Sequence, residues 1–184
     1  NWAESSSHGY ALICSGTSCG GIATPRTGSY VAWLGGANSE ASQINQTIAL
    51  PAGQKVTLSF WRRTTSSDSC GYDYGYVRVL ANGATTTVKT YSLCSSTNTN
   101  GWANAQIDLS AYAGRTVTLI FRTTTDISLI SSFYVDDIKL VSGSTCGLSA
   151  GSENIVEMAA QENGVDIPAS IQPKPAGGTE SGDL

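Results

Sequence analysis

The chain has 184 residues, of which 40% are hydrophobic and only 13% are charged, and its net charge is −4. An average soluble domain has about 25% charged residues, so this surface must consist mainly of Ser, Thr, Asn and Gly, a composition that favours strands and turns over helices. No apolar run approaches the roughly 20 residues that cross a bilayer as a helix, which excludes a membrane-spanning helix.

The charge is unevenly distributed along the chain. Residues 144–184 contain six acidic residues and one lysine and carry a net charge of −5, so residues 1–143 carry +1. A near-neutral body with an acidic end has no basic stripe for phosphates and no polybasic face for anionic lipids. The sequence therefore predicts neither a nucleic-acid partner nor a membrane partner.

Short segments of alternating apolar and polar residues, separated by Gly, Pro and Asn, follow one another through residues 1–142. In chain order they are GSYVAWLGG (28–36), QINQTIAL (43–50), KVTLSFWRR (55–63), DYGYVRVL (73–80), TTTVKTYSL (85–93), AQIDLSAY (105–112), RTVTLIFR (115–122) and FYVDDIKL (133–140). A period of two is typical of strands with one buried face, and Asn82-Gly83 indicates a hairpin turn. The pattern predicts an all-β, two-sheet antiparallel sandwich of the jelly-roll type.

The pattern changes in residues 143–184, which we predict to be a linker, a short helix and an acidic Pro/Gly-rich tail. Ser152 can cap a helix that runs through ENIVEMAAQEN and ends at Gly164. The remaining DIPASIQPKPAGGTESGDL has the composition of a disordered segment when it is left alone. We therefore expect any order in this tail to come from docking on the body, on a neighbouring copy or on another protein.

Five cysteines are available for covalent cross-links: Cys14, Cys19, Cys70, Cys94 and Cys146. The first four lie in turn-like sequences without the CxxC spacing of zinc sites, and His8 is the only histidine. The simplest interpretation is two disulfides, Cys14–Cys19 and Cys70–Cys94, although the sequence leaves other pairings open. Cys146 would then be an unpaired thiol or half of an intermolecular disulfide.

Disulfides indicate an oxidising location, so the protein is predicted to be secreted, extracellular or attached to the cell surface. The start at Asn1 without a methionine fits a chain whose signal peptide has been removed, and fits equally a piece of a longer protein.

The sequence shows no catalytic constellation. A Ser-His-Asp site would have to use His8, and no serine lies in a GxSxG elbow. Asp136 and Asp137 are consecutive on a predicted strand, so their side chains should point to opposite faces and not act as a glycosidase pair. We therefore expect His8 to be an exposed loop residue and the protein not to be an enzyme.

The Asp136-Asp137 pair suggests a metal site. One of the two carboxylates should face the sandwich interior, which is costly unless a cation or hydrogen bonds compensate it. Calcium takes about six to eight oxygen ligands and is the natural partner, with Glu4, Asn38, Glu40 and backbone carbonyls of the glycine turns as candidate co-ligands. The alternative is that both aspartates accept hydrogen bonds from local backbone amides.

Aromatic residues form a second candidate site. Trp61 is out of phase with the core positions of its strand, whereas Tyr72, Tyr74 and Tyr76 share one face of the next strand with Arg78. Flat aromatic faces beside hydrogen-bonding groups suit sugar rings, so these five residues are the predicted binding site for a surface glycan or protein. The alternative is that they are ordinary strand residues that cover the sheets.

Several of these segments also carry a family resemblance. GSYVAWLGG, QTIALPAGQKVTLSFW, DLSAYAGRTVTLIF and FYVDDIKL resemble the calcium-stabilised jelly-roll domains of bacterial secreted proteins, which are similar to carbohydrate-binding modules, to MAM-like adhesion domains and to galactose-binding-like sandwiches. The resemblance covers residues 1–142 and implies an accessory, non-catalytic binding domain. It further implies that Asp136 or Asp137 holds a structural calcium ion, with Glu4 as a looser match.

Two functions follow as expectations. The first is an extracellular binding or adhesion module that attaches to a surface glycan or protein. The second is a structural subunit of an extracellular filament or surface assembly, in which the C-terminal tail adds to an open sheet edge of a neighbouring subunit.

Overall fold

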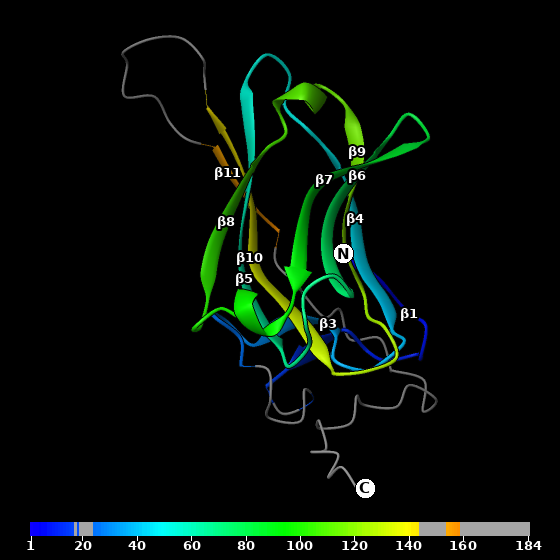
Figure 1. Cartoon of the computed structure of the whole chain (residues 1–184). Helices are drawn as coiled ribbons and strands as arrows, with labels where there is room; N and C mark the ends of the chain where they lie inside the picture. The colour runs from blue at the N-terminus through cyan, green and yellow to red at the C-terminus, as the bar shows by residue number, and fades with distance from the viewer. Residues whose placement is uncertain (17, 19–23, 144–153, 159–184) are drawn as a thin grey trace, which may run out of the picture.

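The computed structural model describes residues 1–16, 18, 24–143 and 154–158. They form two antiparallel sheets that face each other (Figure 1), which confirms the predicted sandwich. The five-stranded sheet has the order β1 (Ala3–Ser6), β4 (Ala41–Ala49), β9 (Thr116–Thr124), β6 (Asp73–Ala81) and β7 (Ala84–Leu93). The second sheet has the order β2 (Ile13–Ser15), β3 (Tyr30–Gly35), β10 (Ser131–Gly143), β5 (Lys55–Ser66) and β8 (Ala103–Asp108), and β11 (Asn154–Met158) pairs with β10.

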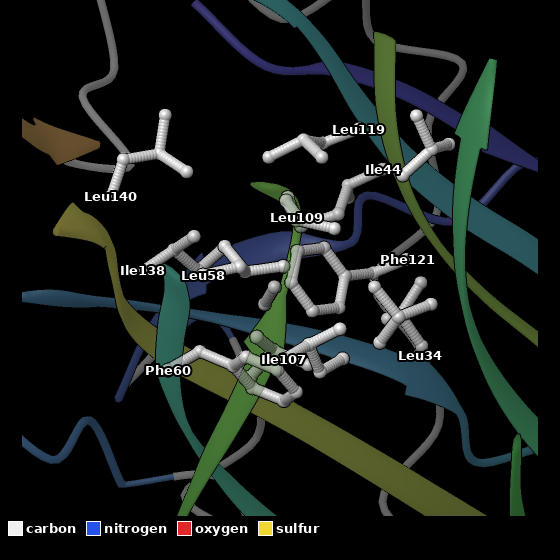
Figure 2. Close-up of a cluster of buried hydrophobic side chains, with 14 of the residues drawn as sticks. Leu34, Ile44, Leu58, Phe60, Ile107, Leu109, Leu119, Phe121, Ile138 and Leu140 are labelled. Carbon is white, nitrogen blue, oxygen red and sulfur yellow. The ribbon is translucent and has the colours of Figure 1, made fainter. Parts of the chain in front are cut away.

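The core lies between the two sheets and is built from the alternating apolar positions of their strands. Figure 2 shows side chains of both sheets meeting in this layer. Phe60 of β5 and Phe121 of β9 lie edge to face across it, with 5.0 Å between their ring centroids. Both are fully buried, and removing a side chain of this kind from water contributes about 1.5–3 kcal/mol. The period of two in the sequence therefore specifies the buried face of β5, β6 and β9, whereas β3 is buried on both faces over residues 31–35.

The β6–β7 hairpin turns at Asn82 and Gly83, as predicted. Both residues have positive φ, 51° and 77°, which is the backbone that a two-residue turn of type I′ requires. The turn matches the twist of the strands and lets Ala81 pair with Ala84.

The strand β11 corrects the expected helix over ENIVEMAAQEN for residues 154–158. These five residues pair antiparallel with Ile138–Ser142 of β10. The reason is that β3 pairs with β10 only over Ser132–Val135, which leaves that edge of β10 free for another strand. Ile155 and Val156 are β-branched and suit a strand. The other residues of the expected helix, the tail and Cys146 lie outside the described residues.

Two further expectations concern cross-links and membrane spans. A disulfide joins Cys70 to Cys94, as the sequence predicts. Cys14 is disulfide-bonded as well, and Cys19 lies outside the described residues. The described part of the chain contains no helix with the length and hydropathy of a membrane span.

The short helices η1 (Ser95–Thr97) and η2 (Ser110–Tyr112) lie in connections that follow β7 and β8. The helix η1 begins directly after Cys94, and the Thr97 side chain bonds back to the carbonyl oxygen of Ser92 at 2.7 Å. It therefore fixes the chain beside the disulfide, close to the loop that leads from β5 to β6.

Candidate functional site

A row of aromatic and cationic side chains lies on the outer face of the five-stranded sheet. Tyr74, Tyr76 and Arg78 alternate along β6 with buried residues, so they point away from the core. The rings of Tyr74 and Tyr76 stack with 6.0 Å between centroids and 27° between planes. The guanidinium of Arg78 lies 4.6 Å from the centroid of Tyr76. These three residues share one face, as the sequence predicts.

The row continues across the neighbouring strands. Tyr76 pairs with Arg122 of β9, and Arg122 pairs with Gln43 of β4. Arg122 Nη1 donates a hydrogen bond to Gln43 Oε1 at 3.2 Å, which joins the side chains of β9 and β4 on this face. We call Tyr74, Tyr76, Arg78, Arg122 and Gln43 the tyrosine strip. It offers two stacked rings, two cations and one amide, which can stack on a flat apolar ligand face and bond its polar edge.

The other two predicted binding residues lie elsewhere. Tyr72 precedes β6 in the loop that carries Cys70, and 59% of its surface is exposed. Trp61 belongs to β5 in the second sheet, and the guanidinium of Arg26 lies 3.8 Å from the centroid of its ring. Because Trp61 and the strip belong to different sheets and both point away from the core, they lie on opposite outer faces. One ligand therefore cannot contact all five of the predicted residues in one flat site.

The prediction that Asp136 and Asp137 point to opposite faces is wrong. A β-bulge shifts the register between Asp136 and Lys139, and Asp137 has a positive φ of 47°. The bulge turns both carboxylates toward one segment. Asp136 accepts the backbone amide of Arg26 at 2.6 Å, while Asp137 bonds to the Arg26 guanidinium and to the Thr27 hydroxyl.

Asp136 makes the contacts of the alternative interpretation, in which backbone amides satisfy the carboxylate. It accepts amides of Arg26, Thr27 and Asp137. Burial raises the pKa of Asp136, whereas these amide bonds act to lower it and the nearby Asp137 charge acts to raise it further. The Arg26–Thr27 segment is thereby tied to the middle of β10, at the bulge.

The other expected calcium ligands lie in separate hydrogen-bond networks. Glu4 accepts the backbone amides of Leu12 and Ile13 at 2.6 and 3.0 Å. Glu40 accepts bonds from serine hydroxyls and from His8. The Oδ1 atom of Asn38 is buried and has no hydrogen-bond partner among the described residues. A calcium site that uses Asp136 or Asp137 with these residues stays a prediction.

His8 lies in an exposed turn, as expected, and contacts a buried acid. Its Nδ1 bonds to Glu40, and its ring stacks on Tyr10 at 5.5 Å between centroids. The hydroxyls of Ser6 and Ser7 also donate to Glu40. A serine hydrolase needs a hydrogen bond between the serine hydroxyl and the histidine that acts as its base. In this cluster both serine hydroxyls donate to the Glu40 carboxylate instead. The cluster fastens β1 to the chain between β3 and β4.

Sequence reasoning missed a cluster of three aspartates at one end of the sandwich. Asp68 follows β5, Asp73 begins β6, and Asp126 follows β9. They offer ligand atoms that all lie within 4.8 Å of one another. In the sequence, the position of Asp68 and Asp73 on either side of Cys70 is the only hint of this cluster. Asp126 is 53 residues away from Asp73, so no local pattern connects it to the other two. A strand order that places β6 beside β9 is needed to bring them together.

Two members of this aspartate cluster are buried, Asp126 is half-buried, and the three carboxylates concentrate negative charge at one point. Asp73 is fully buried, and Asp68 is 4% exposed. Burial raises the pKa of Asp73, and the charges of Asp126 and Asp68 add to the rise, against bonds from Ser131 and from the Asp126 amide. Three carboxylates in this arrangement can hold a metal ion.

The two facing sheets define the class of this domain: it has the β-sandwich fold of carbohydrate-binding modules and of gingipain adhesin domains. The structure of TmCBM61 in complex with β-1,4-galactotriose superposes with a TM-score of 0.52 and 15% identity, covering 76% of this chain and 86% of that one. The K1 cleaved adhesin domain of Lys-gingipain from Porphyromonas gingivalis W83 gives 0.51 and 11%, covering 76% and 89%. At this level of identity the likeness is one of fold.

Particular proteins are similar in sequence. The pre-pro-metalloprotease PrtV of Vibrio cholerae is 34% identical over 112 residues, which is 54% of this chain and 12% of that protein. Bacillopeptidase F of Bacillus subtilis is 36% identical over 72 residues, 38% of this chain and 5% of that protein. The chain thus spans only a small part of the length of these curated relatives. No known family model matches the sequence.

Proposed function

We propose that this domain is a non-catalytic accessory module of a secreted bacterial protease, and that it binds glycan through the tyrosine strip. The observation that carries the proposal is the stacked pair of Tyr74 and Tyr76 on an outer sheet face, with Arg78 and Arg122 beside it. Stacked rings bind the apolar face of a sugar, and the guanidinium and amide groups bond its hydroxyls.

The similarity of fold to carbohydrate-binding modules and of sequence to two bacterial proteases supports this role. The Cys70–Cys94 disulfide supports a location outside the cytoplasm, because such bonds persist in oxidising compartments. A binding module attached to a protease would raise the local concentration of the enzyme at its target. In this proposal the module attaches the protease to its target and carries out no reaction.

The first experiment titrates the purified domain with β-1,4-galactotriose by calorimetry and screens it on a glycan array. Tyr76→Ala should weaken binding to the best glycan about tenfold or more, because the loss of one stacking contact of about 1.5 kcal/mol corresponds to that factor. Tyr72→Ala is the matched control, since this exposed tyrosine lies outside the strip and should leave affinity unchanged.

Three results contradict the proposal: no glycan bound by the wild type, equal losses for Tyr72→Ala and Tyr76→Ala, or a loss confined to Trp61→Ala. The last result would move the site to the outer face of the second sheet. Binding to a protein surface that Tyr76→Ala removes, without any glycan binding, would identify a protein as the partner of the same strip.

A further inference from the structure

Among the residues that the structure describes, no positively charged side chain forms an ion pair with the three carboxylates of the aspartate cluster. Within the described ranges the ion pairs use the acids Glu40 and Asp137, so Asp68, Asp73 and Asp126 take part in none of them. Buried like charges without a counter-ion are costly, because burial removes the water that would screen them.

A second observation points to a missing ligand. Asp73 Oδ1 accepts the amide of Asp126 at 2.7 Å, and Asp68 Oδ1 accepts the amide of Ser69 at 2.6 Å. The other oxygen of each residue, Oδ2, is buried and has no hydrogen-bond partner in the part of the chain that the structure describes. An unsatisfied buried acceptor costs about 1–3 kcal/mol, and more when it is charged. Two such atoms in one cluster therefore indicate a cation.

The chemistry of the surrounding atoms selects the kind of cation. Every candidate donor of the cluster is an oxygen, since the neighbouring Cys70 is held in a disulfide and offers no thiolate. Neutral oxygens lie at the same end of the sandwich, where the Ser131 hydroxyl bonds to Ser66 Oγ at 2.7 Å and to the carbonyl oxygen of Leu93 at 3.3 Å. Oxygen-only sites bind hard cations, and calcium sheds its water for protein oxygens more readily than magnesium does.

We propose that Asp68, Asp73 and Asp126 bind one calcium ion, which joins the loop between β5 and β6 to the loop between β9 and β10. Such an ion would offset most of the negative charge of the three carboxylates and satisfy the two unpaired oxygens. It would also cross-link the two sheets at one end, because β5 and β10 belong to one sheet and β6 and β9 to the other.

The disulfide is placed to hold this site in shape. Cys70 lies between Asp68 and Asp73, and its partner Cys94 follows the end of β7. The amide of Ser95 donates to the carbonyl oxygen of Asp68 at 2.8 Å. The loop that carries two of the ligands is thus fixed before the ion arrives, which lowers the entropy cost of binding. Removal of the disulfide should therefore weaken calcium affinity.

The test uses the full chain, stripped of metal with EDTA and titrated with CaCl2 by calorimetry, with thermal unfolding in parallel. We expect one ion per chain and a rise in Tm of several degrees, because a ligand that binds only the native state stabilises it by mass action. Asp73→Asn should weaken calcium affinity at least tenfold. In EDTA this variant should have a Tm equal to or above that of the wild type, since the amide relieves the repulsion among carboxylates.

The control is Asp137→Asn, which alters the acid pair of β10 and should keep calcium affinity. If Asp73→Asn fails to fold, Asp126→Asn carries the same expectation at the least buried member of the cluster. The proposal is overturned if the wild type shows neither heat nor a shift of Tm with CaCl2. It is overturned as well if Asp73→Asn retains calcium affinity while Asp137→Asn loses it, which would place the ion at the pair in β10.

Discussion

Gly35 ends β3 in a left-handed conformation, with a φ of 72°. A Cβ atom at this position would lie 2.5 Å from the carbonyl oxygen of Ser131 and 3.1 Å from the Thr123 methyl group. The amide of Gly36 donates to the same carbonyl at 2.6 Å. The close approach of β3 to the start of β10 therefore depends on the absence of a side chain at one residue.

Gly35→Ala should lower the free energy of unfolding by clearly more than the roughly 1–2 kcal/mol that a left-handed alanine costs alone. The extra loss comes from the collision with the Ser131 backbone, which cannot rotate away. Gly53→Ala is the matched control, because Gly53 has a φ of 67° and open space around its Cβ position. Urea unfolding of both variants measures the difference, and equal losses would contradict the argument.

At the scale of elements, β10 organises the second sheet. It pairs along its length with β5 on one side, and with β3 and then β11 on the other. The bulge after Asp136 divides these two partners, because β3 ends its pairing at Val135 and β11 begins at Ile138. A strand added in this way completes an edge whose backbone groups would otherwise be unpaired.

Deletion of residues 144–184 should leave the sandwich folded, because the core lies within residues 1–143. The exposed edge of β10 should make the shortened chain self-associate, since an unpaired strand edge is a template for another chain. Circular dichroism reports the fold, and sedimentation reports the association state. A shortened chain that stays monomeric would show that β11 is not needed to protect this edge. If instead the full chain assembles and the shortened chain does not, the tail carries the contact, which would favour the role as a subunit of an extracellular assembly.

At the scale of the whole molecule, two layers are held together by the apolar core and, near one end, by the Cys70–Cys94 disulfide. The Cys70–Cys94 bridge closes a loop with a sequence separation of 24. It ties the connection between the two sheets to the end of β7, beside the aspartate cluster. Strands far apart in the sequence thus meet where the proposed ion would bind.

The double substitution Cys70→Ser with Cys94→Ser should lower the free energy of unfolding by about 3 kcal/mol, the entropy effect expected for a loop of this length. Urea unfolding in EDTA isolates this effect from calcium. A change below 1 kcal/mol in EDTA would mean that the loop is held by its other contacts, such as the Ser95–Asp68 hydrogen bond.

Local patterns were enough for a large part of this fold. Alternation marked the core faces of β5, β6 and β9, and Asn82-Gly83 marked the hairpin. The disulfide between Cys70 and Cys94 was the simplest of the pairings that the sequence left open. The short strands β1 and β2 were missed because AESS and ICS are too short to show a period. The grouping of Tyr74, Tyr76 and Arg78 on one face was also predictable, because the period of a strand is local.

By itself, the sequence determined the buried face of the regularly alternating strands β5, β6 and β9, since that face depends only on the alternation of neighbouring residues. Only the tertiary structure decided which strands are neighbours. It therefore decided that Trp61 lies on the sheet opposite the tyrosine strip, and that a bulge turns Asp136 and Asp137 to one side. It also decided that Asp126 meets Asp73, because contacts between residues so far apart depend on the order of strands in the sheet and on no local signal.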